Sequence, residues 1–133
     1  MSSPTDVRAQ WAAHHPGLDT SPMEVVALLK HATGLLAKTV EPLYEGAPLT
    51  VPETDMLIPL RYATGPVIAR GLADRRAALV TITPAGAEAI DALFPRQLAA
   101  EVELLAGLGE DRDWVLRALG RLVEAMESAA SRG

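Results

Sequence analysis

Apolar side chains recur every three or four positions along much of the chain, which is the spacing that gathers them on one face of an α-helix. The first such stretch follows Ser21 and carries the stripe Val25, Leu29, Ala32, Leu36, Val40 and Leu43. Two further leucines, Leu28 and Leu35, widen this stripe. A stripe of that width predicts a long helix that is covered on more than one side, as in a subunit interface.

Capping patterns predict where the helices of the first half begin. Ser21-Pro22-Met23-Glu24 and Thr50-Val51-Pro52-Glu53 are capping boxes with a proline in the first turn. Ser3-Pro4-Thr5-Asp6 predicts a short helix that ends near Ala13. Pro42 and Pro59 fall inside the two later helices, so we expect each helix to bend or stop there.

The second half of the chain also reads as helix. Thr83 and Pro84 are an N-cap and a first helical residue, and they predict a long helix over Ala85–Leu108 with a kink at Pro95. Gly107 to Gly109 ends it. A last helix carries the stripe Val115, Leu119, Leu122 and Met126.

Between these helical halves, Pro66–Arg70 and Ala77–Thr83 are rich in Val, Ile and Thr and flank a turn-prone segment. This pattern predicts a β-hairpin, which must pack against helices because two strands alone are marginally stable. We therefore expect a mainly α fold in one domain, residues 1–133. It comprises an N-terminal helix and loop (1–21), two helices (22–62), the hairpin (66–83) and the C-terminal helices (84–133).

The amino-acid composition excludes several classes of function. A net charge of −5 has the wrong sign for a chain whose main partner is a phosphate backbone. The absence of cysteine excludes disulfides, thiolate metal sites and cysteine nucleophiles. No apolar run approaches the roughly 18 residues of a membrane span, and the N-terminus lacks a signal-peptide core. We expect a cytoplasmic protein without a membrane partner.

The hairpin region resembles a known family. Asp74-Arg75-Arg76, followed by a strand and by Thr83-Pro84-Ala85-Gly86, resembles the wing of a MarR-type winged-helix regulator where it runs into a dimerisation helix. Residues 16–26, 49–53 and 104–108 resemble helix-entry segments of the same family. The resemblance implies a homodimeric helical scaffold with one wing hairpin, a truncated winged helix.

One block of the family pattern is absent. A complete member has a support helix and a recognition helix between its second helix and its wing. These need on the order of 25–30 residues. Only Ala63–Pro66 lies there in this chain. We therefore expect the helix-turn-helix to be lost and sequence-specific DNA binding with it, which leaves Arg75 and Arg76 as weak phosphate contacts.

In the family, small and often aromatic molecules bind between the dimer helices and the DNA-binding lobe. The resemblance thus implies a homodimer that binds a small apolar metabolite in this crevice. The lining residues would be Leu35, Tyr44, Leu57, Arg61, Tyr62 and Ile68. Pairing with a full-length relative into a heterodimer is a variant of this hypothesis.

Two other functions remain open. The first is a cofactor-free enzyme, of cyclase, isomerase or dehydratase type, that acts on a natural-product intermediate of secondary metabolism. Tyr44 and Tyr62 would donate protons and Arg61 would stabilise negative charge, with His31, Glu41 or Asp55 as the base. The second is transcriptional regulation through the wing or a partner subunit. His14-His15 has no third ligand at a recognisable spacing, so we expect no metal site and no cofactor.

Overall fold

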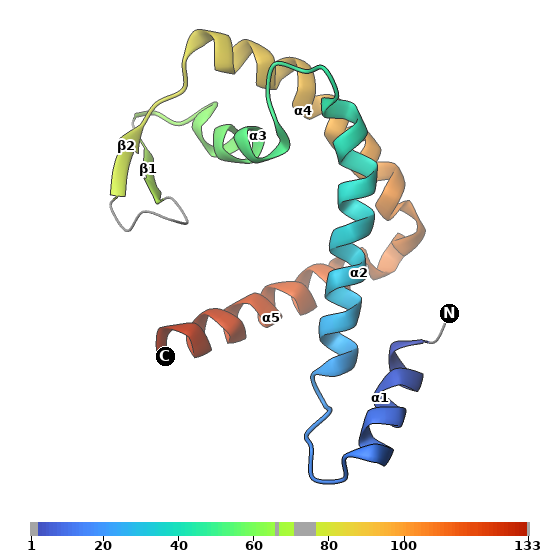
Figure 1. Ribbon diagram of the computed structural model, residues 1–133. Coiled ribbons are helices and arrows are strands. Elements are labelled where there is room, and N and C mark those ends of the chain that lie inside the picture. The colour runs from blue at the N-terminus through green and yellow to red at the C-terminus, as the bar shows by residue number, and fades with distance from the viewer. Residues whose placement is uncertain (1–2, 66, 71–76, 133) are drawn as a thin grey trace. The chain divides into compact units, whose positions relative to one another are not determined.

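The computed structural model describes residues 3–65, 67–70 and 77–132 (Figure 1). Most of them are helical. The α-helices are α1 (Pro4–His14), α2 (Met23–Val40), α3 (Val51–Leu57), α4 (Pro84–Leu105) and α5 (Arg112–Arg132). The 3₁₀ turns are η1 (Glu41–Tyr44), η2 (Ile58–Leu60) and η3 (Ala106–Asp111), and the two strands are β1 (Val67–Arg70) and β2 (Ala77–Val80).

The predicted helix start at Ser3 and the predicted capping box at Thr50 are confirmed, and the Ser3 start is itself a capping box. At the start of α1, Ser3 Oγ accepts the Asp6 N–H at 3.1 Å and the Asp6 carboxylate accepts the Ser3 N–H. At the start of α3, Thr50 and Glu53 exchange the same two bonds at 3.3 and 2.9 Å. Each box satisfies two N–H groups that a helix start would otherwise leave without a partner.

The predicted box at Ser21 is wrong. The N-cap of α2 is Pro22, whose side chain makes no capping hydrogen bond. The Ser21 N–H instead donates to Asp19 Oδ1 at 3.0 Å. A turn built on Asp19 therefore competes with the capping box for the same residue, and the turn prevails.

Pro42 and Pro59 act as predicted at the ends of α2 and α3. α2 ends at Val40, and the chain continues as the 3₁₀ turn η1 with Pro42 in its first turn. α3 ends at Leu57, and η2 carries Pro59. A proline ring removes one backbone donor and crowds the preceding turn, so the chain tightens to 3₁₀ geometry at both places.

The start of α4 is also confirmed, because Thr83 Oγ1 accepts the Gly86 N–H at 3.0 Å. Pro95 lies inside the helix. The helix ends at Leu105, three residues earlier than expected, and passes into η3. There Gly109 has a φ of 52°, a value that glycine adopts readily and other residues seldom do.

The predicted fold class is wrong in its β part. β1 and β2 pair antiparallel, with Val67 opposite Val80 and Arg70 opposite Ala77. Yet β2 stops at Val80 rather than Thr83, because Thr83 turns the chain into α4 as its N-cap. Within the described part of the chain, neither strand has an extended contact with a helix. Two four-residue strands, which are marginally stable as a pair, do not constitute the wing of a winged helix. The mainly α prediction is correct, and the truncated winged helix is not.

The buried core is small and lies where α2 and η1 meet α4. Val40, Tyr44 and Leu93 form its centre, and Leu43, Ala47, Leu49 and Val51 pack around them. Leu60 and Ile90 are the other buried large apolar residues of the described chain. The start of α4 lies close to α3, since a Cβ on Gly86 would stand 3.6 Å from Leu57 Cδ1. The core thus positions η1, η2 and α4.

The chain forms two compact units, residues 1–101 and 102–133. The second unit contains the end of α4, then η3 and α5, and neither η3 nor α5 has a buried residue. The expectation of a single domain remains a prediction. Among the described residues, none of the helices combines the length and the apolar composition that a membrane span requires.

Candidate ligand-binding site

Arg61 and Tyr62, two of the predicted site residues, lie together immediately after η2. Arg61 donates from Nε to Asp91 Oδ1 at 2.8 Å and from Nη2 to Asp91 Oδ2 at 2.7 Å. These two parallel bonds form a bidentate ion pair. The guanidinium carbon also stands 4.5 Å from the centroid of the Tyr62 ring, a cation–π distance. Leu60 and Ile90, which precede Arg61 and Asp91 in the chain, are both buried.

The ion pair changes the titration of both its members. The hydrogen bonds from Arg61 lower the pKa of Asp91 below its ordinary value of 3.8. The same bonds raise the pKa of Arg61. Arg61 is therefore fully charged and already bound to a carboxylate, which limits its use for a ligand anion. Tyr62 as a whole residue remains 81% exposed.

Tyr44 is a buried core residue, and its hydroxyl has a partner within the protein. The hydroxyl donates to Gln97 Oε1 at 2.5 Å, and Gln97 Nε2 donates to Glu101 Oε2 at 3.2 Å. Tyr44 and Gln97 are 8% and 7% exposed. A buried hydroxyl and amide are stable only when hydrogen-bonded, so this chain of bonds ties η1 to α4. The sequence predicts that Tyr44 contacts a ligand. In the structure Tyr44 is part of the buried core.

The other predicted site residues do not form one crevice in the described structure. Leu35 and His31 are exposed on α2. Leu57 is partly buried beside Gly86. Ile68 is paired with Leu79 in the strand ladder, and its side chain lies outside the described part of the structure. Arg75 and Arg76 also lie outside the described residues.

Most of the apolar surface of α2 is open. Val25, Val26, Leu28, Leu35 and Leu36 are between 40% and 60% exposed, and of the residues of α2 only Val40 is buried. Near its start, α2 contacts α1, where Arg8 donates to Glu24 Oε1 at 3.2 Å and to Thr20 Oγ1 at 3.3 Å. The wide stripe predicted from the sequence is therefore present, and residues 1–101 cover little of it.

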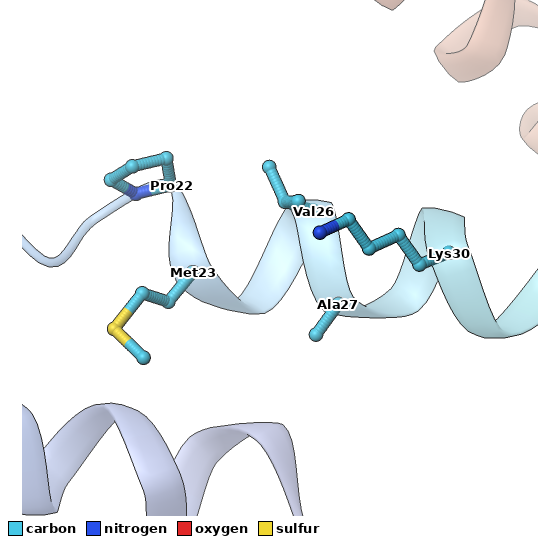
Figure 2. Close-up of a pocket in the computed structure, with 5 residues that line it drawn as sticks. All are labelled: Pro22, Met23, Val26, Ala27 and Lys30. Carbon is cyan, nitrogen blue, oxygen red and sulfur yellow. The ribbon is translucent and has the colours of Figure 1, made fainter.

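A hollow lies on the first two turns of this helix. Its lining consists of Pro22, Met23, Val26, Ala27 and Lys30, and its volume is ≈ 380 Å³ (Figure 2). Figure 2 shows the Lys30 side chain lying along α2 toward Val26. Lys30 is the sole charged residue of the lining, and neither ion pair of the described chain uses it. The hollow therefore offers apolar walls and one cationic rim group.

A second hollow, of ≈ 420 Å³, lies at the end of α1 and is lined by Gln10, Trp11, His14 and His15. The Trp11 and His15 rings stack with centroids 4.9 Å apart, and His14 Nδ1 lies 2.9 Å from the Gln10 carbonyl oxygen. The stacking covers one face of the Trp11 ring and one face of the His15 ring, and the contact with Gln10 uses His14 Nδ1. In the described chain, no group of three potential metal ligands comes together.

Sequence reasoning missed Asp91, Gln97 and Lys30. Asp91 and Gln97 lie 30 and 53 residues from their partners, and no local pattern links residues at such distances. Lys30 does have a local signal, since it falls three or four residues after Val26 and Ala27 on the same side of the helix. That spacing could have identified it.

Comparison of the sequence with models of known protein families and with curated proteins finds no match. The resemblance to MarR-type regulators therefore remains a prediction from the residues that carry it.

Proposed function

We propose that this protein binds a small, largely apolar molecule that carries one anionic group, and that it binds this molecule in the α2 hollow. The observation that carries the proposal is the lining of the hollow: four apolar residues and one lysine that has no ion-pair partner in the described structure. The hollow is shallow and largely open to solvent, and its volume of ≈ 380 Å³ lies at the lower end of the roughly 300–1,000 Å³ that is usual for ligand sites.

Tyr44 and Arg61, two polar residues of the crevice predicted from the sequence, are already hydrogen-bonded within the protein. This favours the α2 hollow as the binding site. The Tyr44 hydroxyl donates to Gln97, and Arg61 is bound to Asp91 through Nε and Nη2. A ligand that used them would first have to break bonds that hold η1 and η2 to α4. Lys30 requires no such rearrangement. Enzymatic and regulatory functions remain predictions, and no contact among the described residues favours either of them.

Two fluorescent probes separate the apolar and the charged parts of the proposed site. Anilinonaphthalene sulfonate is an apolar anion, and N-phenylnaphthylamine is its neutral analogue. We expect Lys30→Met to weaken binding of the anion by about two- to fivefold, the size of an exposed charge contact, and to leave the neutral probe unchanged. Val26→Ser should weaken binding of both probes, because it removes apolar wall area.

Lys38→Met is the matched control. Lys38 is an exposed lysine on the same helix that does not line the hollow. If Lys38→Met weakens binding of the anion as much as Lys30→Met does, the effect reports net charge alone. Equal binding of both probes to the wild-type chain and to every variant would also contradict the proposal.

A further inference from the structure

The α2 hollow is a groove between two rows of side chains that run along the helix. Pro22 and Val26 form one row, because residues four positions apart stack along a helix, and Met23 and Ala27 form the other. Figure 2 shows the Lys30 side chain lying lengthwise between the rows. Val26 is 43% exposed, so the groove is open along its length. A flexible aliphatic chain, the stem of Lys30, thus already lies in the groove.

We infer that the ligand of this groove is a linear, medium-chain carboxylate, an inference that rests on the proposed function. The groove extends from Pro22 to Lys30, about 12 Å at 1.5 Å per residue. An extended chain advances about 1.2 Å per bond, so about ten bonds span this length. The part from Pro22 to Val26, toward which Lys30 points, is about 6 Å long and holds about five bonds. These limits correspond to an acyl chain of about six to ten carbon atoms.

The side chains of the groove favour an aliphatic chain over a ring. None of the five lining residues is aromatic, so an aromatic ligand would find no ring to stack on. Met23 has a flexible thioether side chain, which adapts to an irregular apolar surface. Each methylene group of a linear chain would contact apolar side chains of both rows. The gain in affinity therefore depends on chain length.

The charges at the two ends of the groove give the direction of the chain. Asp19 and Glu24 flank the Pro22 end, where an anionic head group would be repelled. Arg8, the cation at that end, is already bound to Glu24 at 3.2 Å. Lys30 lies at the other end, and the residues three and four positions from it are all uncharged: Val26, Ala27, Thr33 and Gly34. We therefore place the carboxylate at Lys30 and the methyl end of the chain at Pro22.

A length series tests the inference. Saturated carboxylates of four to fourteen carbon atoms are used to displace anilinonaphthalene sulfonate from the wild-type chain. A fully buried methylene group strengthens binding about fourfold, and the open groove covers about half of the chain, so we expect about twofold per methylene. The affinity should stop rising at about six to ten carbon atoms, where the chain reaches the end of the groove. A rise that continues to fourteen carbon atoms, or no rise at all, would overturn the inference.

A substitution in the groove has a matched control on the same helix. Ala27→Leu places a larger side chain in the groove and should weaken decanoate binding about fivefold or more, since several methylene contacts are lost. Ala32→Leu makes the same change at an exposed position of α2 that does not line the hollow, and it should leave binding unchanged. Equal effects of the two substitutions would contradict binding in the groove.

A dicarboxylate tests the direction of the chain. Decanedioate carries a second carboxylate at the end that decanoate leaves apolar. Met23→Lys places a cation near the Pro22 end, so it should strengthen binding of decanedioate and not of decanoate. A gain of the same size for both compounds would show that the carboxylate of decanoate is not held at Lys30.

The inference and the proposed function fail in different ways. If Lys30→Met leaves binding of anilinonaphthalene sulfonate unchanged, the proposed function is wrong and the inference fails with it. The narrower test compares undecanoate with 2-naphthoate, an aromatic carboxylate with the same number of carbon atoms. We expect undecanoate to displace the probe at a lower concentration. If binding of the probe depends on Lys30 but 2-naphthoate displaces it equally well, the site is supported and the linear ligand is wrong.

Discussion

Thr54 of α3 is fully buried, with 0% exposure, and its hydroxyl has no hydrogen-bond partner. This is unusual within the chain itself, because Thr33 and Thr39 of α2 each donate to the carbonyl four residues earlier at 2.9 Å. Burial of a hydroxyl without a partner costs about 1–3 kcal/mol in proteins. Valine has nearly the same shape and places a methyl group where threonine has the hydroxyl. We therefore expect Thr54→Val to raise the free energy of unfolding by about 1–2 kcal/mol.

Urea titration at one fixed protein concentration is the assay, because any association would make the midpoint depend on concentration. The expected gain corresponds to a rise in Tm of roughly 3–10 °C for a chain of this length. Thr33→Val is the control: its hydroxyl is exposed and bonded, so its effect should stay within about 0.5 kcal/mol. If Thr54→Val lowers stability by more than Thr33→Val does, the Thr54 hydroxyl has a partner, and the reasoning is refuted.

Two further predictions concern the bonds to α4. Tyr44→Phe should lower the unfolding free energy by about 1–2 kcal/mol, since it leaves Gln97 Oε1 buried without a donor; an unchanged urea midpoint would show that the amide finds another partner. Because hydrogen bonds lower the pKa of Asp91 and of Glu53 below their ordinary values of 3.8 and 4.5, stability should be constant near neutral pH and fall as the pH drops below about 4.5. Asp91→Asn should reduce the fall in unfolding free energy between pH 7 and pH 3, as measured by urea titration. An unchanged pH dependence would mean that the bond to Arg61 contributes nothing to stability.

The helix starts could be predicted from the sequence because their causes are local. Thr50 and Thr83 each bond to a backbone N–H three residues away, so the residues that determine the cap are adjacent in the chain. Ser21 shows the limit of this reasoning, since Asp19, two residues earlier, takes its N–H. Two local motifs then overlap, and their spacing alone does not decide between them.

The partners in the candidate site could not be predicted in the same way. Helical spacing indicates which side chains share a face, and it correctly places Leu28 and Leu35 beside the main stripe of α2. It does not indicate which face meets which neighbour, so it leaves open whether Tyr44 points to a ligand or to Gln97. The environment of Tyr44 depends on how α4 packs against η1. This packing is set by the burial of Leu93 and its neighbours, and no residue pattern near Tyr44 indicates it.

The ion pair between Arg61 and Asp91 joins residues 30 positions apart, beside the buried Leu60 and Ile90. The two ends of the intervening segment, which carries β1 and β2, are therefore held at one place by contacts outside the strands. The entropy of such a closed loop changes slowly with length, by only about 0.6 kcal/mol for each doubling. The segment between Tyr62 and Thr81 can consequently vary in length and sequence at little cost to the core, which makes it the natural insertion point for a foreign peptide.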